Sequence, residues 1–129
     1  MQEILAEWIS KAEGDFASAQ RELRARRAPN YDAACFHSQQ CAEKYLKAFL
    51  VAQKISPPRI HNLIELLKLC LKRDGTFELI RPALEALNTY AVDIRYPGEF
   101  ATKDEARDAV NAMKQVREFA RGKFGQAIK

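Results

Sequence analysis

Apolar residues recur every three or four positions along most of the chain, and this spacing predicts amphipathic helices. The first stripe, within residues 3–27, consists of Leu5, Trp8, Ala12, Phe16, Ala19 and Leu23. Pro29 interrupts it, and Asn30 is placed to cap a second helix from Tyr31 to about Gln53. The pattern therefore predicts two long helices joined by a short connection.

Two capping boxes mark the starts of later helices. Asn62 and Glu65 have the spacing of such a box ahead of a short helix, which Gly75 is placed to end. Thr102 and Glu105 form the second box. The helix expected after it has a core stripe of Ala106, Val110, Met113, Val116 and Ala120.

Prolines limit the remaining stripe, which consists of Phe77, Ile80, Leu84, Leu87, Ala91 and Ile94. Pro82 should either start the main part of this helix or kink it. Pro97 disfavours helical geometry in the residue before it, so we expect the helix to end at Arg95 or Tyr96.

No segment shows the alternation of a β-strand. Four long helices, one short helix and brief connections predict an all-α fold, an antiparallel up-and-down four-helix bundle with an additional short helix. A length of 129 residues lies in the usual range of one domain, and no repeat or linker divides the chain. Residues 1–129 are therefore expected to form a single helical domain.

Composition narrows the functional classes. The N-terminus lacks a basic region followed by an apolar run, and no apolar stretch approaches the roughly 20 residues needed to span a bilayer, so we expect a cytoplasmic protein without membrane contact. Cys35, Cys41 and Cys70 have no metal-binding spacing and are expected to be reduced core residues. His37 and His61 also lack ligand spacing, so the sequence predicts no metal and no cofactor.

Positive charge is unevenly distributed, with a net charge of +4 and a pI near 9.0. The basic residues gather in two groups, Arg21, Arg24, Arg26 and Arg27, and Arg117, Arg121, Lys123 and Lys129. Such cations complement the C-terminal ends of two helices, and phosphate binding is the alternative interpretation.

The polar face of the second predicted helix holds the main candidates for a site. It carries Phe36, His37, Gln40, Glu43, Lys44 and Lys47. Glu43 and Lys47 have the favourable order for an ion pair, and a solvated face with a modest pair is the plain interpretation. Phe36 points instead to an interface, because a large aromatic residue in a polar arc needs cover from a dimer partner or another helix.

Asp93, Arg95 and Tyr96 occur together near the expected end of the fourth helix. The acidic and basic side chains could pair with each other and anchor the following turn, or they could receive an anion. His61, just ahead of the short helix, is expected to orient the turn through a hydrogen bond.

Four segments carry a recognisable pattern: Trp8 with Ala12 and Asp15, FHSQQCAEKYLKAFL at 36–50, HNLIELL at 61–67, and DIRYP at 93–97. Together they resemble the HEPN family, the higher eukaryotes and prokaryotes nucleotide-binding domain. The resemblance covers nearly the whole chain. It implies a bundle of four main helices plus a short one, frequent homodimerisation and, in bacteria and archaea, genetic pairing with a minimal nucleotidyltransferase, often as toxin and antitoxin.

The family also contains metal-independent ribonucleases, in which a dimer brings together Arg and His from a motif of Arg, four to six residues, then His. The corresponding positions here hold Asn30, Tyr31 and Asp32 ahead of His37, and Lys54, Ile55 and Ser56 ahead of His61. None is arginine, and lysine does not reproduce the planar fork of arginine. The missing motif argues against enzymatic activity.

We therefore predict a non-catalytic protein that homodimerises and partners a minimal nucleotidyltransferase, with nucleotide or RNA as a further ligand. The predicted surface comprises Gln40, Glu43, Lys44, Lys47, Asp93, Arg95 and Tyr96, with Phe36, His37 and His61 as further candidates. In this prediction Glu43 positions Lys47, while Lys44 and Arg95 meet phosphate or a carboxylate. The alternatives are a divergent ribonuclease that uses His61, Arg95 and Lys54, and a scaffold whose polar stripe is ordinary surface.

Overall fold

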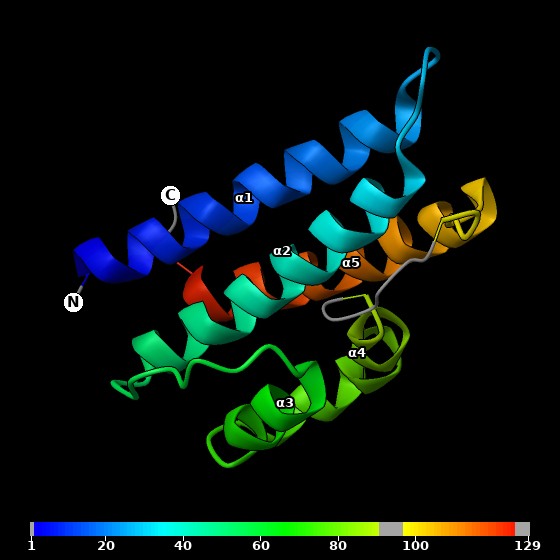
Figure 1. Ribbon diagram of the computed structural model, residues 1–129. Helices are drawn as coiled ribbons and strands as arrows, with labels where there is room; N and C mark the ends of the chain where they lie inside the picture. The colour runs from blue at the N-terminus through cyan, green and yellow to red at the C-terminus, as the bar shows by residue number, and fades with distance from the viewer. Residues whose placement is uncertain (1, 91–96, 126–129) are drawn as a thin grey trace.

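The computed structural model describes residues 2–90 and 97–125 (Figure 1). Its helices are α1 (Gln2–Arg24), α2 (Tyr31–Ala52), α3 (Leu63–Leu71), the 3₁₀ helix η1 (Gly75–Ile80), α4 (Arg81–Asn88) and α5 (Lys103–Phe124). The described residues contain no strand, which confirms the all-α prediction. None of the described helices is long and apolar enough to cross a bilayer.

The four main helical segments of the bundle alternate in direction along the chain. In Figure 1, α1 runs antiparallel to α2. The backbone N–H of Ala101 donates to Asp32 Oδ1 at 2.8 Å, so α5 starts beside the start of α2 and runs parallel to it. The N–H of Leu63 donates to Asn88 Oδ1 at 2.6 Å, which joins the start of α3 to the end of α4. Thus α1, α2, η1 with α4, and α5 alternate up and down, and α3 is the additional short helix.

The predicted helix starts are confirmed by their caps. Asn30 accepts a hydrogen bond from the first turn of α2 at 2.9 Å. Asn62 caps α3 by accepting the N–H of Glu65 at 3.1 Å, but the Glu65 side chain pairs with Lys68, so the structure shows the cap without the second bond of the predicted box. The capping box at Thr102 has both of its bonds, at 3.0 and 2.9 Å. These bonds satisfy N–H groups that have no partner inside a helix.

The fourth helical segment is shorter than predicted. Residues 75–80 form η1, and Pro82 stands near the start of α4 because it has no N–H to continue a helix through this point. The end of α4 at Asn88 comes before the expected Arg95 or Tyr96, so that prediction is wrong for this helix. Its terminal Asn88 side chain is instead bonded to the start of α3.

The core surrounds α2, because α1 packs on one side of this helix and α3 and α5 pack on the others. Large side chains of α2, α3, η1, α4 and α5 are fully buried, among them Tyr45, Leu66, Phe77, Leu84 and Met113. Burial of this kind supplies most of the free energy that holds helices together. Cys35, Cys41 and Cys70 are buried in the same core, as predicted.

Candidate functional site

The polar face of α2 is buried over much of its length. Glu43 is 3% exposed and Lys47 is 5% exposed, so the interpretation of this face as solvated is wrong for both residues. The reason is the central position of α2, because α1 and the segment that leads into α3 also cover its polar face. Charged groups in such a place must be paired and hydrogen-bonded.

Glu43 is the centre of a polar cluster that consists of Gln40, Glu43, Lys47 and His61, here called the Glu43 cluster. Lys47 Nζ donates to Glu43 Oε2 at 3.0 Å, and His61 Nδ1 lies 3.1 Å from both carboxylate oxygens. Gln40 Nε2 contacts Oε1 at 3.4 Å. The carboxylate thus positions Lys47, as predicted, and also holds the His61 ring.

The backbone of His61 is held as well. Gln39, which is fully buried, donates from Nε2 to the His61 carbonyl at 3.1 Å, and Gln40 donates to Gln39 Oε1 at 2.7 Å. The His61 side chain nevertheless keeps 62% of its surface exposed. His61 is therefore a fixed residue with an accessible ring, and its predicted role in orienting the turn is carried by both side chain and backbone.

A second carboxylate on α1 forms the Asp15 cluster, which consists of Asp15, His37 and Lys44. His37 Nδ1 lies 2.8 Å from Asp15 Oδ1, and Lys44 Nζ donates to Oδ2. Asp15 is buried although it is acidic. The sequence offered one signal for this role, because Asp15 falls within the apolar stripe of α1 between Ala12 and Ala19.

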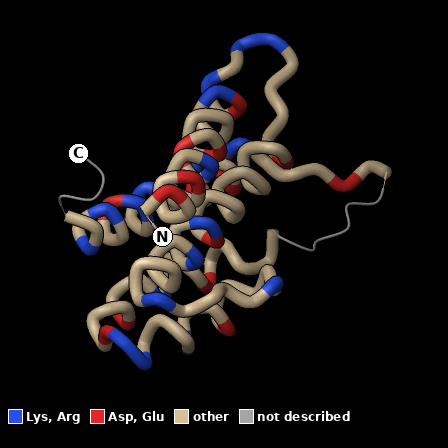
Figure 2. The backbone as a smooth tube through the Cα atoms, turned by 90° about the vertical axis from the view of Figure 1, so that its left-hand side faces the viewer, with Lys and Arg blue, Asp and Glu red and all other residues tan. Residues whose placement is uncertain are grey.

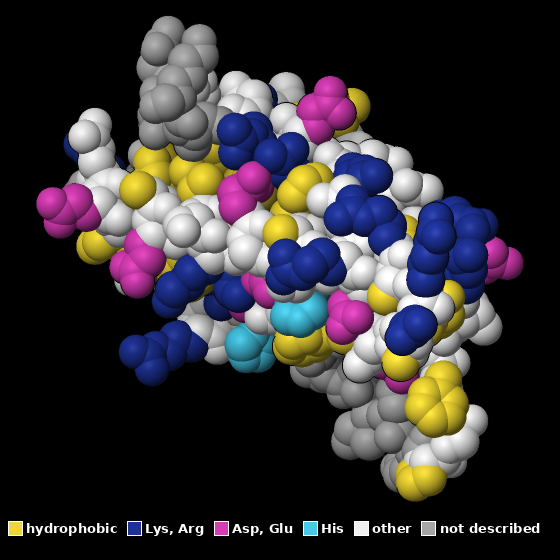
Figure 3. All heavy atoms as spheres, turned by 90° about the horizontal axis from the view of Figure 1, so that it is seen from above, with side chains coloured by type: hydrophobic (Ala, Val, Ile, Leu, Met, Phe, Trp, Pro, Cys, Tyr) yellow, Lys and Arg dark blue, Asp and Glu magenta, His cyan; other side chains and the backbone are white. Residues whose placement is uncertain are grey.

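The two clusters place both histidines on one side of the molecule. In Figure 3 both histidines are visible on the same face, with Lys and Arg side chains around them. In each histidine Nδ1 contacts a carboxylate oxygen. The Nε2 atoms of His37 and His61 are therefore the nitrogens that can bind another partner. A carboxylate behind an imidazole also fixes its orientation.

Phe36 contacts His37 and is 43% exposed. Its ring centroid is 5.6 Å from that of His37, in an edge-to-face arrangement. With this much of the side chain exposed, cover by a dimer partner stays a prediction. We use the name histidine face for the surface made by Phe36, His37, Lys44 and His61.

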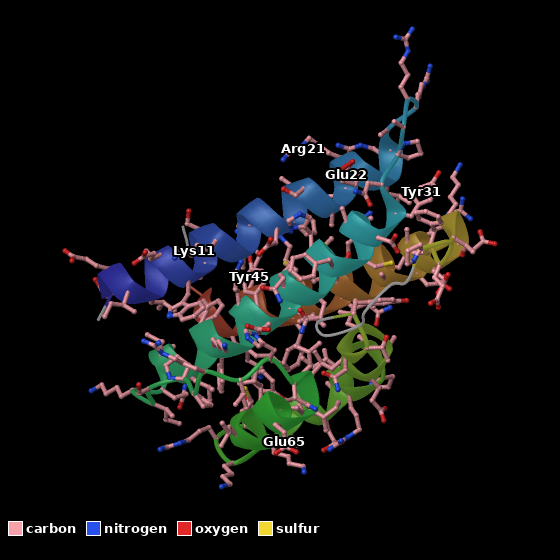
Figure 4. The ribbon with its side chains drawn as sticks, viewed as in Figure 1. Lys11, Arg21, Glu22, Tyr31, Tyr45 and Glu65 are labelled. Atoms are coloured by element: carbon pink, nitrogen blue, oxygen red, sulfur yellow. The ribbon has the colours of Figure 1, made fainter. Side chains whose placement is uncertain are left out.

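A third cluster joins α1, α2 and α5, and sequence reasoning missed it. Arg117 Nε and Nη2 both donate to Glu13 at 2.8 Å, and the Tyr45 hydroxyl donates to the same carboxylate (Tyr45 is labelled in Figure 4). The hydrogen bond from Arg117 lowers the pKa of Glu13. Burial, followed by the bond to Glu13, raises the pKa of Tyr45. The three residues are far apart in sequence, so only the fold shows their contact.

The basic groups near the helix ends have partly structural roles. Arg21 and Arg24 lie in the last turn of α1, and more basic residues follow on the connection to α2 (Figure 2). Arg117 belongs to the Glu13 pair, and Lys123 Nζ lies 2.7 Å from Asp74 Oδ2. Arg21 and Arg24 thus lie where cations complement the C-terminal end of a helix, whereas Arg117 and Lys123 pair with carboxylates of other elements.

Asp93, Arg95 and Tyr96 lie outside the described residues, so their assignment to the site stays a prediction. Within the described residues, no group of three or more His, Cys, Asp or Glu side chains is arranged to hold a metal ion.

Comparison with known families decides the classification. The family model described as HEPN domain matches residues 5–123, which is nearly all of the chain. The chain belongs to the HEPN family. The resemblance found in the four sequence segments is thereby confirmed.

Relatives of this HEPN chain agree with the assignment. A protein of Methanocaldococcus jannaschii named "Putative toxin MJ1304" is 28% identical, over 92% of this chain and 89% of its own length. The crystal structure of ST0689, described as an archaeal HEPN homologue, has a TM-score of 0.75 and 28% identity, over 92% and 96% of the two chains. The crystal structure of TT1696 from Thermus thermophilus has a TM-score of 0.79 and 25% identity, over 92% and 97%.

Proposed function

We propose that this HEPN chain is a non-catalytic binding module that homodimerises and partners a minimal nucleotidyltransferase in a toxin-antitoxin-like pair. The histidine face carries the interaction. The observation on which this rests is that an exposed aromatic residue, Phe36, packs against His37, one of two imidazoles that buried carboxylates hold in place. The relative named as a toxin supports the wider context.

The composition of the histidine face suits an interface. Aromatic side chains and groups that are already rigid contribute most to binding, since less conformational freedom is lost on association. His37 and His61 are fixed by Asp15 and Glu43, and Phe36 packs edge-on against His37. A partner would therefore meet a preformed surface.

The charges around the histidines argue against a ribonuclease. Cleavage of RNA without metal needs a proton-transfer group and a cation close to the developing phosphorane charge. The described cations bonded to the two clusters are Lys44 and Lys47, and each is already held by a carboxylate. Neither has the planar fork of arginine.

The oligomeric part is tested by sedimentation of Phe36→Asp, with Leu79→Asp as the matched control. Leu79 is 75% exposed and lies on η1, whereas Phe36 lies on the histidine face. We expect wild type and Leu79→Asp to be dimers and Phe36→Asp to be monomeric, because a buried unpaired carboxylate is costly at an interface. A Phe36→Asp protein that still forms dimers would contradict the assignment of this face.

The partner is tested by co-expressing the chain with each minimal nucleotidyltransferase from its source genome, and nucleotides and short RNA are titrated separately. Lys44→Ala and Arg95→Ala should weaken retention or ligand binding, while exposed Lys114→Ala on α5 should not. If both site variants leave partner, nucleotide and RNA binding unchanged, the assignment of the site is wrong.

A divergent ribonuclease is the second candidate, and one observation favours it. His61 is exposed while Glu43 holds its Nδ1, so Nε2 is free to exchange a proton with a substrate. RNA incubated with chelator and the protein distinguishes the two functions. Cleavage that disappears in His61→Ala would establish the ribonuclease, and intact RNA would favour the binding module.

A further inference from the structure

A pocket of about 640 Å³ lies where the first turns of α1 meet the end of α2 and the segment before α3. Trp8 on α1 and Pro57 and Pro58 on the segment contribute apolar surface, together with Val51 and Ile55. This volume is within the range of pockets that take small molecules, roughly 300–1,000 Å³. The pocket is large enough for a compact ring compound.

The charges in this pocket have one sign. Its lining includes Lys47, Lys54 and Arg59 and has no acidic residue. Lys54 and Arg59 form no ion pair with a described residue, and both are exposed, whereas Lys47 is buried and lies 5.8 Å from the centre of the Trp8 ring. The pocket thus combines an aromatic and apolar lining with an uncompensated positive rim.

We infer that this pocket binds a small anion carried on a flat apolar ring. The ring would pack against Trp8 and the prolines, and the anionic group would pair with Arg59 and Lys54 at the rim and approach Lys47. A nucleoside monophosphate and an aromatic carboxylate share this chemistry. Neither a neutral ring nor a bare anion satisfies both halves of the pocket.

Lys47 links the pocket to the Glu43 cluster, because the same ammonium group lines the pocket and donates to Glu43 at 3.0 Å. A bound anion competes with Glu43 for Lys47 and changes the charge balance next to His61. His37 is held by Asp15 in the other cluster and serves as an internal reference. Control of partner binding by this ligand rests on the proposed function of the histidine face, whereas binding to the pocket does not.

The chain contains a single tryptophan, so Trp8 fluorescence reports directly on the pocket. The probes are AMP, phenylacetate, adenosine and inorganic phosphate, with excitation at the red edge of tryptophan absorption, where nucleotides do not absorb. We expect saturable changes with AMP or phenylacetate, and weaker binding of adenosine and phosphate. The first two probes distinguish a nucleotide from an aromatic carboxylate.

Exposed Arg59 provides the variant least expected to disturb the fold. Arg59→Ala should weaken binding of the anionic ring by about tenfold, the loss expected for one charge-assisted hydrogen bond. Lys72→Ala, at the end of α3 and outside the pocket lining, should have no effect. Lys47→Met should also weaken binding, and its folding is checked by circular dichroism.

Imidazole NMR signals give a second readout that does not depend on fluorescence. The bound anionic ring should shift the signals of His61 and leave those of His37 nearly unchanged. The inference is overturned if neither AMP nor phenylacetate gives a saturable change in either measurement, or if adenosine or phosphate alone binds as tightly. It is also overturned if Arg59→Ala and Lys47→Met bind like wild type. Because Phe36→Asp is tested by sedimentation, the proposed function can still be decided if the pocket proposal fails.

Discussion

Lys47→Met should lower the free energy of unfolding more than the same substitution would at an exposed lysine on a helix. The substitution keeps most of the side-chain length but removes the ammonium group that donates to Glu43 at 3.0 Å. Glu43 is only 3% exposed, so water cannot replace the lost partner. Removing one member of a buried pair costs about 3–5 kcal/mol, and the remaining bonds from His61 and Gln40 place the expected loss near about 3 kcal/mol.

The pair Lys68 and Glu65 provides the matched control. It is also a lysine and a glutamate on one helix, with a distance of 3.2 Å, but the two side chains are 60% and 56% exposed. Lys68→Met should therefore change the free energy of unfolding by no more than about 0.5 kcal/mol. The two pairs differ by one position in spacing, four against three, and their main difference is burial.

Urea unfolding followed by circular dichroism measures both variants. With a slope of about 1.5 kcal/mol per M, a loss of about 3 kcal/mol lowers the midpoint by about 2 M. The double variant Glu43→Met with Lys47→Met should recover part of the loss, because no buried charge is then left without its lysine. The reasoning is refuted if Lys47→Met stays within about 0.5 kcal/mol of wild type, or if the double variant is as unstable as the sum of the single ones.

Other consequences follow from the remaining clusters and caps. Arg117→Ala should cost about 2–3 kcal/mol in urea unfolding, since it removes two 2.8 Å bonds to partly buried Glu13, and Arg117→Lys should cost less. Arg117 lowers the pKa of Glu13 in the folded protein, so the stabilisation from this pair is full above the ordinary pKa of 4.5 and is lost as the pH falls through the lower folded pKa. Urea unfolding curves measured at a series of acid pH values should show this loss in wild type and little of it in Arg117→Ala. Burial raises the pKa of the Cys70 thiol to about 12, so iodoacetamide should label it only when the protein unfolds, and rapid labelling of native protein would contradict its burial. Thr102→Ala should lower stability by about 1 kcal/mol, whereas Thr102→Ser should be nearly neutral in the same unfolding assay.

Local sequence determined where most helices begin. Asn30, Asn62 and Thr102 each satisfy backbone N–H groups of the residues that follow, so these starts depend on neighbours within a few positions. The repeat of apolar residues fixed the all-α class for the same reason, since a helix brings positions three and four apart onto one side. The four family segments likewise could be read directly along the chain.

The end of α4 and the burial of the polar face of α2 could not be predicted without the tertiary structure. Asn88 ends α4 while its side chain bonds to Leu63, a residue 25 positions away. Helical spacing placed Glu43 and Lys47 on the polar side of α2 but could not show that α1 and the segment before α3 would cover them. Periodicity describes the faces of one helix, and burial depends on how many other elements pack against it.

The sequence by itself thus determined the all-α class, most helix starts and the HEPN family, because these follow from short-range contacts and from the order of residues. Only the tertiary structure brought Asp15 to His37 and Lys44, and Glu13 to Arg117. These contacts join residues 22 to 104 positions apart, and each depends on the packing of whole helices. The physical reason is that a buried carboxylate selects its partner by proximity in the folded core, where water cannot replace that partner.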